Sequence, residues 1–191
     1  INSTRRYGKQ DYSFSFLSIR LPEGGLHANV ILYDFTKNTV ERFDPYGNTI
    51  YIDPNLDDIL EEELTWNTGL SYLSPAQYMP VSGLQTLSDE TNSLNQKNGD
   101  FGGYCLAWCI WYIEHRINNP SISQKDLITK TKKKLISNDN TIIEYIRNYA
   151  NKINNIRITF LKKLGISTKN ISNQILPPKD SIKLYQHISD M

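Results

Sequence analysis

The chain has 191 residues, with 21 basic and 20 acidic side chains and a formal net charge of +1. This length suits one domain with a full hydrophobic core. The balanced charge gives no positive field that would recruit nucleic acid or an anionic membrane. No apolar run approaches the roughly 20 residues of a membrane span. Neither nucleic acid nor a membrane is therefore expected as a partner.

Two cysteines, Cys105 and Cys109, lie four residues apart on one predicted helix. A disulfide between two such cysteines would not stabilise the fold, because backbone hydrogen bonds already connect neighbouring turns of the helix. The sequence therefore predicts no disulfide framework and a reducing intracellular compartment. The chain begins at Ile1 without a methionine, which suggests a fragment or a processed product.

Three β-strands are predicted in the first quarter of the chain. Apolar residues alternate in the first segment, and their frame changes near Phe16 and Leu17, which suggests a bulge. The next two segments are separated by a five-residue turn, which favours a hairpin or meander. The three predicted strands span residues 12–21, 27–33 and 39–43.

The hairpin geometry places two chemically active residues side by side. Pro45 ends the third strand, because proline cannot continue a central ladder. The start of one antiparallel strand lies beside the end of the next. His27 and Asp44 are therefore expected to come together.

The rest of the chain reads mainly as helices, so the fold class is α+β. We expect a single domain over residues 1–166 and a C-terminal tail or arm over 167–191. The predicted elements are an acidic amphipathic helix at 54–66, an extended segment at 70–79, a long loop at 81–99, a buried helix at 105–117, and helices at 123–136 and 141–164.

Cys105 is the strongest candidate nucleophile. It follows Gly102–Gly103 and opens an apolar helix, where the macrodipole and free backbone N–H groups favour the thiolate. A thiol needs a base, and His27 is the expected one. His115 lies ten residues along the same helix, roughly 15 Å away, and cannot reach the thiol. His187 lies in the tail and would reach only if the tail folded back.

An acid is expected to orient His27, and Asp44 is favoured because the hairpin places it there. Asp34 is the rival, but its position in the connecting turn suits a turn-stabilising role. An alternative for Asp44 is that its carboxylate merely caps N–H groups of its own turn.

The order of His27, Asp44, a glutamine and Cys105 at a helix start resembles the papain-like cysteine proteases of clan CE. These include the proteases of SUMO and ubiquitin-like proteins and the maturation proteases of adenovirus and large DNA viruses. The resemblance covers about residues 15–120 and looks closest to giant-virus members. It implies an α+β papain-like fold, with a central antiparallel sheet and the nucleophile at the N-terminus of a buried helix.

The resemblance also implies an activity, that of a cysteine-type peptidase. Such an enzyme would hydrolyse peptide or isopeptide bonds after small residues of the Gly-Gly type, acting as a monomer without a cofactor or metal. The implied partners are ubiquitin, a ubiquitin-like modifier or a viral polyprotein, in the host cytoplasm or the virion. Cys105 would attack the carbonyl, His27 would move the proton and Asp44 would orient His27.

A glutamine upstream of the cysteine is implied as the oxyanion donor. Gln85 is favoured by its Gly-Leu-Gln context, and Gln96 is the alternative. Ala28 follows His27, where many ubiquitin-like protein proteases have a tryptophan that clamps a Gly-Gly tail. Two further functions stay open, namely an inactive protein-binding module of the same fold and an acyltransferase that uses the same triad.

Overall fold

The computed structural model describes residues 11–22, 24–48, 54–88, 90, 103–137, 142–167 and 177–189. The chain divides into two compact units, Ile1–Arg147 and Asn148–Met191, and each is described by itself. The division of the sequence into a domain over 1–166 and a tail over 167–191 stays a prediction.

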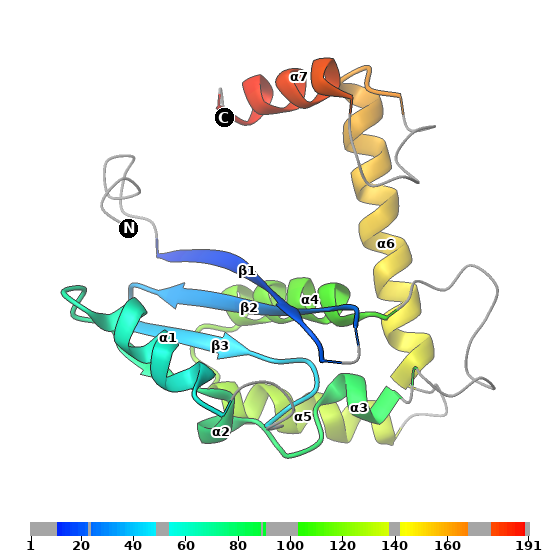
Figure 1. The fold of residues 1–191 in the computed structure, drawn as a ribbon. Coiled ribbons are helices and arrows are strands. Elements are labelled where there is room, and N and C mark those ends of the chain that lie inside the picture. Colours follow the sequence, from blue (N-terminus) through cyan, green and yellow to red (C-terminus); the bar gives the residue numbers. More distant parts are fainter. Residues whose placement is uncertain are drawn as a thin grey trace. The chain divides into compact units, whose positions relative to one another are not determined.

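The first unit is built on a four-stranded sheet in the order β1-β2-β3-β4 (Figure 1). The first three strands pair antiparallel with one another in chain order, as the hairpin pattern predicted. The last two strands pair in parallel, so the sheet is mixed and not wholly antiparallel. Parallel neighbours need a crossover, and helix α1 provides it. The strands are β1 (Tyr12–Arg20), β2 (Leu26–Asp34), β3 (Thr39–Phe43) and β4 (Ser71–Leu73).

The predicted bulge in β1 is absent, because its register with β2 is continuous from Tyr12 opposite Asp34 to Arg20 opposite Leu26. The change of frame has another cause. Both faces of the sheet carry apolar side chains, so successive apolar residues such as Phe16 and Leu17 point to opposite faces.

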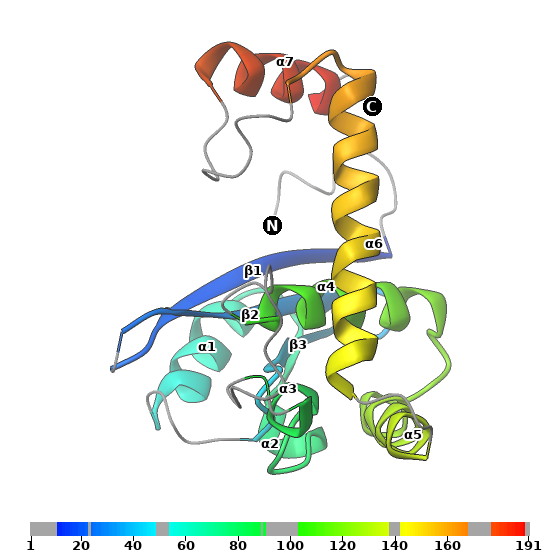
Figure 2. The same ribbon diagram turned by 90° about the vertical axis from the view of Figure 1, so that its right-hand side faces the viewer.

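Helices cover the two faces of this sheet (Figure 2). On one face, α1 (Leu56–Thr65) packs through Leu60 and Leu64 on a cluster of buried strand residues. On the other, α4 (Cys105–Asn118) stacks Tyr112 on Phe43, with ring centroids 4.1 Å apart. The buried cluster on the α1 face comprises Ile31, Val40, Leu70 and Tyr72.

A buried ion pair ties α4 to the sheet. Arg116 donates from Nε to Glu41 Oε1 at 2.8 Å, and both side chains are fully buried. Tyr112 donates to the same carboxylate oxygen at 3.0 Å, and Gln124 donates to the other. A buried charge that is paired and hydrogen-bonded in this way fixes the position of the helix, because breaking one partner leaves the other uncompensated.

The remaining helices of the first unit flank these two. Residues 84–88, which the sequence assigned to a long loop, form a short helix because their backbone bonds to the turn after β3. Gln85 N donates to Pro45 O at 3.0 Å, and Gly83 N donates to Tyr46 O at 2.7 Å. These helices are α2 (Pro75–Tyr78), α3 (Leu84–Ser88) and α5 (Gln124–Ile136).

Helix α6 (Ile142–Lys163) begins in the first unit and ends in the second, which also contains α7 (Pro178–Ser189). In α7, Ile182, Tyr185 and Ile188 recur every three residues and are 58% to 78% exposed. None of the helices in the described ranges has the length and apolar character needed to cross a membrane.

Candidate thiol and imidazole site

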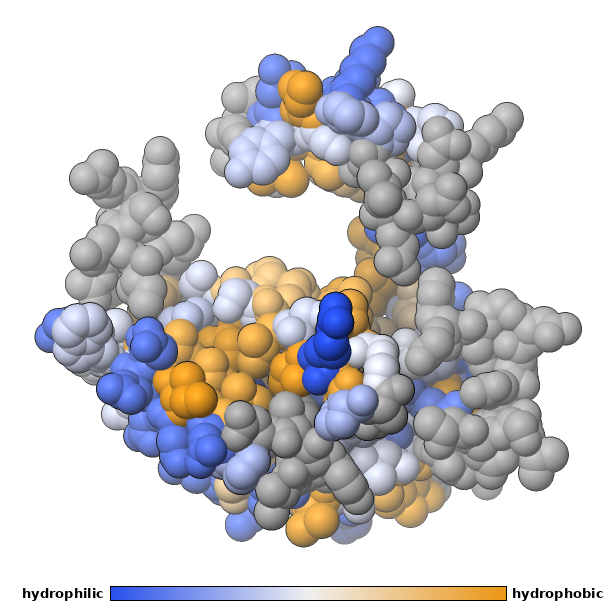
Figure 3. All heavy atoms as spheres, viewed as in Figure 1, coloured by the Kyte–Doolittle hydropathy of each residue, from blue (hydrophilic) through white to orange (hydrophobic). Residues whose placement is uncertain are grey.

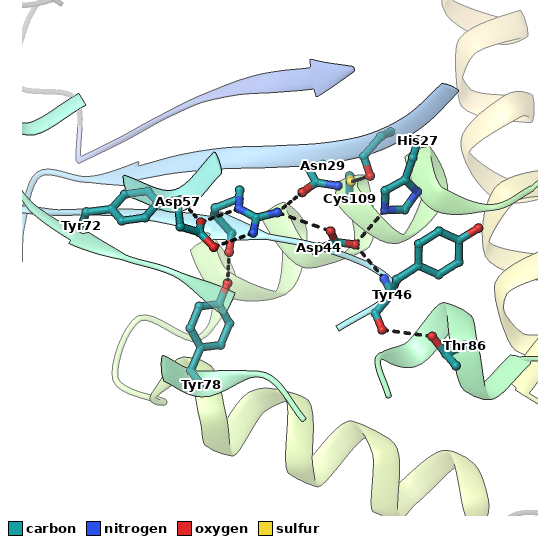
Figure 4. Close-up of polar contacts among 11 residues, drawn as sticks. His27, Asn29, Asp44, Tyr46, Asp57, Tyr72, Tyr78, Thr86 and Cys109 are labelled. Carbon is teal, nitrogen blue, oxygen red and sulfur yellow. Dashed lines mark hydrogen bonds and ion pairs between the residues drawn. The ribbon is translucent and has the colours of Figure 1, made fainter. Parts of the chain in front are cut away.

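His27 and Asp44 meet at the end of the sheet, where β2 begins and β3 has just ended (Figure 4). The ring Nε2 of His27 lies 2.7 Å from Asp44 Oδ1, and each side chain is only 1% exposed. Antiparallel pairing of β2 with β3 produces this contact, as the hairpin pattern predicted.

The turn after Asp44 holds the imidazole from another side. Tyr46 stacks on His27, with ring centroids 4.2 Å apart and an angle of 17° between the planes. The backbone N–H of Tyr46 donates to Asp44 Oδ1 at 2.9 Å. Asp44 therefore caps its own turn and also holds His27, so the two roles weighed for it coexist.

Arg42 supports Asp44 and was not found by sequence reasoning. Residues two apart on a strand share a face, so Arg42 lies beside Asp44, with Nη1 3.3 Å from Asp44 Oδ2 and 2.6 Å from Asn29 Oδ1. Its Nε and Nη2 each donate to Asp57 at 2.8 Å, and Tyr72 donates to Asp57 at 2.6 Å (Figure 4). Asp57 thus links α1 to the site, and the paired Arg42 lowers the pKa of Asp57 despite burial.

Cys105 is the first residue of α4, and its thiol lies close enough to the His27 imidazole for the two groups to influence each other's ionisation. Since Asp44 takes Nε2 of the ring, Nδ1 is left for the thiol. Burial opposes ionisation of Cys105, but the interaction with His27 and the backbone groups of Ala28 and Leu106 together outweigh burial and lower the pKa of the thiol. The structure therefore brings Cys105, His27 and Asp44 into one row.

The imidazole responds in the opposite direction. Burial disfavours the imidazolium, but hydrogen bonds to Asp44 and Cys105 outweigh this effect and raise the pKa of His27 to about 9. A raised imidazole pKa and a lowered thiol pKa describe one proton shared between the two groups. Both shifts favour a thiolate beside an imidazolium over a neutral thiol beside a neutral imidazole.

Cys109 is chemically different from Cys105, although it lies one turn further along α4. Its thiol is fully buried and donates to Ala28 O at 3.3 Å. Burial raises the pKa of this thiol well above its ordinary value. Its assignment from the sequence as a small buried hydrophobe agrees with this position.

Gln85 lies beside the start of α4, and its side-chain amide donates to Glu90. Its Nε2 donates to Glu90 Oε2 at 2.9 Å, and its Oε1 is buried without a hydrogen-bond partner among the described residues. Glu90 also accepts from Tyr104 N at 2.9 Å and from Ser88 Oγ at 2.8 Å. Sequence reasoning missed Glu90, which has no neighbouring motif, and Gln96 lies outside the described residues.

The other sequence candidates lie apart from this cluster. His115 binds Trp111 O at 2.8 Å through Nδ1 and stacks on the Trp111 ring. His187 belongs to the second unit and contacts the Phe160 ring there. Asp34 accepts from Thr36 N at 3.1 Å, as expected for a turn-stabilising aspartate. The described residues contain no group of three or more His, Cys, Asp or Glu side chains that could hold a metal ion.

One comparison with known proteins gives a relative, and no family model matches the chain. The relative is a protein of Acanthamoeba polyphaga mimivirus, a giant virus, that is named as an ankyrin repeat protein. It is 30% identical over 195 residues, which cover 95% of this chain. The chain spans only 25% of the length of that protein.

This comparison corrects the function expected from the motif order. The relative carries the name of a repeat protein and not of a protease. It contradicts the resemblance to clan CE and, with it, the cysteine-type peptidase acting on ubiquitin, ubiquitin-like modifiers or viral polyproteins. The kinship with a viral protein is supported, and the name of the relative is consistent with a protein partner.

Proposed function

We propose that this chain is a protein-binding module that holds an extended segment of a partner protein along the outer edge of β1. One observation carries this proposal. Phe14 and Phe16 are 49% and 47% exposed on an edge strand that pairs with β2 on one side. Within the described ranges, no strand pairs with the other side of β1.

The two phenylalanines form a small aromatic platform. Their rings meet edge to face, with centroids 5.8 Å apart. They lie opposite Leu32 and Val30 of β2, so both rings project from the same face of the sheet. Figure 3, which views the opposite face of the sheet with α1 in front, shows that apolar surface also gathers on that face. A ligand side chain placed there would bury aromatic area, which is a large source of binding free energy.

The composition of β1 suits pairing with another strand. Edge strands are usually protected by a charged side chain, a proline or a bulge, yet residues 12–19 contain no charge and no proline and keep a continuous register. An extended partner segment can bond to the free backbone groups of such an edge. Apolar side chains at alternate positions of that segment would lie on Phe14 and Phe16.

The giant-virus relative supports a binding role. An ankyrin repeat has about 33 residues and consists of a β-turn and two helices, whereas the described residues of this chain surround a four-stranded mixed sheet. The repeats of the relative are therefore expected outside the quarter of its length that this chain matches. Repeat arrays form extended binding surfaces, so a module beside them fits an assembly that recruits proteins.

A peptide selection tests this proposal. Short random peptides displayed on phage are selected on the intact chain and on a Phe14→Lys/Phe16→Lys double variant. The matched control is Ile182→Lys/Ile188→Lys, which charges two side chains of α7 that are 59% and 58% exposed. We expect peptides with alternating apolar residues that bind the wild type and the control equally, and the double variant at least tenfold more weakly.

Two results would overturn the proposal. The first is that no peptide is enriched on the wild type. The second is that the enriched peptides bind the Phe14→Lys/Phe16→Lys variant as well as they bind the wild type. Circular dichroism of both variants shows whether each remains folded.

Within this module, we propose that Cys105, His27, Asp44 and Gln85 form a site with an ionised thiol. The row from Cys105 to Asp44 and the opposite pKa shifts of Cys105 and His27 support the ionised state. Gln85, held by Glu90, closes the site on the side of the α4 N-terminus.

A further inference from the structure

We propose that Cys105 is a site of reversible oxidation, at which hydrogen peroxide forms a sulfenic acid that Cys109 does not resolve and that a small-molecule thiol converts into a mixed disulfide. This inference rests on the ionised-thiol site proposed above. It goes beyond that site by naming two reagents and by assigning different fates to the two cysteines of the chain.

The contact between Cys105 and His27 supplies both parts that the first step needs. The thiolate sulfur attacks one peroxide oxygen, so an S–O bond forms while the O–O bond breaks. Sulfur loses two electrons and the peroxide gains them. The leaving hydroxide takes the proton of the neighbouring His27 imidazolium, which gives water and a neutral imidazole. Cys105 is partly exposed, so a molecule as small as peroxide can reach it.

Cys109 is poorly placed to close a disulfide with the oxidised Cys105. Side chains four residues apart on a helix have Cβ atoms about 5–6 Å apart, whereas a disulfide needs about 3.5–4.5 Å. The attacking sulfur must also be a thiolate. The Cys109 thiol is fully buried, donates to Ala28 O and has a raised pKa, so it stays protonated.

The sulfenic acid is therefore left for an external thiol. A thiol such as glutathione attacks the sulfur of Cys105, an S–S bond forms and the sulfenic oxygen leaves as water. A second thiol molecule can then restore Cys105 by thiol–disulfide exchange. The added group would sit at the first residue of α4, next to Tyr104, whose backbone N–H bonds to Glu90.

The test treats the full chain with hydrogen peroxide and dimedone at pH 6 and locates the adduct by peptide mass spectrometry. Wild type is compared with Cys105→Ala and with Cys109→Ala, the matched control that removes the other thiol. We expect equal adduct formation on Cys105 in wild type and Cys109→Ala, and none in Cys105→Ala. The rate should exceed that of free cysteine at least tenfold. Glutathione in place of dimedone should give one mixed disulfide that dithiothreitol removes.

Three results would overturn this inference. An adduct on Cys109 would show that peroxide oxidises Cys109 and that Cys105 is not the reactive thiol. An adduct that forms in Cys109→Ala but is replaced by an internal disulfide in wild type would show that Cys109 does resolve. If Cys105 is oxidised no faster than free cysteine, its thiol has no enhanced reactivity toward peroxide. If iodoacetamide still labels Cys105 rapidly in that last case, the oxidation fails while the ionised thiol stands; slow labelling overturns both.

Discussion

At the scale of residues, hydrogen bonds join His27, Asp44, Arg42 and Asp57 in a row, and Cys105 interacts with His27 at one end of it. In this row, Asp44 accepts from Arg42 and is hydrogen-bonded to His27, and Asp57 accepts from Arg42. The central residues His27, Asp44 and Arg42 are buried, so their interactions are weakly screened by solvent. The state of the thiol therefore depends on the whole row.

The first prediction concerns the rate at which iodoacetamide alkylates Cys105 at pH 6. An ordinary thiol with a pKa near about 8.5 is almost wholly protonated there. Contact with His27 lowers the pKa of Cys105, so wild type should react at least tenfold faster than His27→Gln. Intact mass spectrometry follows the reaction, and Cys109→Ala is the control with an unchanged rate. Equal rates in wild type and His27→Gln would contradict the ionised site.

The sequence could place part of this row and not the rest. His27 and Asp44 are joined by the register of one hairpin, which is a local property that spacing reveals. The bond from Arg42 to Asp57 depends on how α1 docks on the sheet, and no short-range pattern contains that information. Glu90 bonds to Tyr104 at the start of α4, but it lies in a polar segment whose sequence has no helical or strand periodicity that would predict this contact.

At the scale of elements, two connections bring distant segments to the site. The Asp57 carboxylate anchors α1 to Arg42 of β3. Glycines allow the turn after β3 to touch the segment before α3, because a Cβ at Gly83 would lie 2.2 Å from Pro45 O and 2.4 Å from Gly47 N. Hence Gln85 is delivered to the site by backbone contacts.

The second prediction concerns Asp57→Asn, which removes the charge that anchors α1. The pKa of Asp57 is lowered in the folded state, so its contribution to stability is present above its unfolded pKa of about 3.9 and is lost as the pH falls through the folded value. At pH 7 the variant should lose about 1–3 kcal/mol of unfolding free energy. The difference from wild type should shrink toward pH 3.

Urea denaturation at the two pH values measures this change. Asp58→Asn is the matched control, because Asp58 is exposed in the same first turn of α1. It should cost no more than a few tenths of a kcal/mol. An Asp57→Asn effect that equals the control at pH 7, or that persists undiminished at pH 3, would contradict the anchoring role.

The third prediction concerns the close approach at Gly83. Gly83→Ala places a Cβ against three backbone atoms that cannot move aside as a side chain can, so it should cost about 3 kcal/mol or more. Gly69→Ala is the control, since Gly69 has φ +71° but open space around it, and should cost about 1 kcal/mol. Thermal unfolding by calorimetry compares the two. Equal losses would show that α3 does not depend on this contact.

Element prediction succeeded where the pattern was local. The first three strands and the helix that begins at Cys105 were predicted close to their observed bounds. The parallel pairing of β4 with β3 was not predicted, because a three-residue strand carries little sequence signal. The short α3 was also missed, since contacts with residues 45–46 stabilise it and its own periodicity does not.

At the scale of the whole molecule, the order of a few motif residues was a weak guide to function. The motif order predicted a protease, and the comparison with a giant-virus ankyrin repeat protein contradicts that activity. The arrangement of helices around the sheet is α+β, while its papain-like character stays a prediction. A fold can host many functions, and the exposed edge of β1 favours binding.

Amide hydrogen exchange tests the central claim most directly. The chain is measured alone and saturated with a peptide selected on it, and protection is mapped along the sequence. We predict new protection concentrated in β1, because a paired peptide strand covers its free backbone groups. The Phe14→Lys/Phe16→Lys variant should show no such protection of β1 when the peptide is added. Protection that falls on α7 or on the start of α4, with β1 unchanged, would contradict binding at this edge.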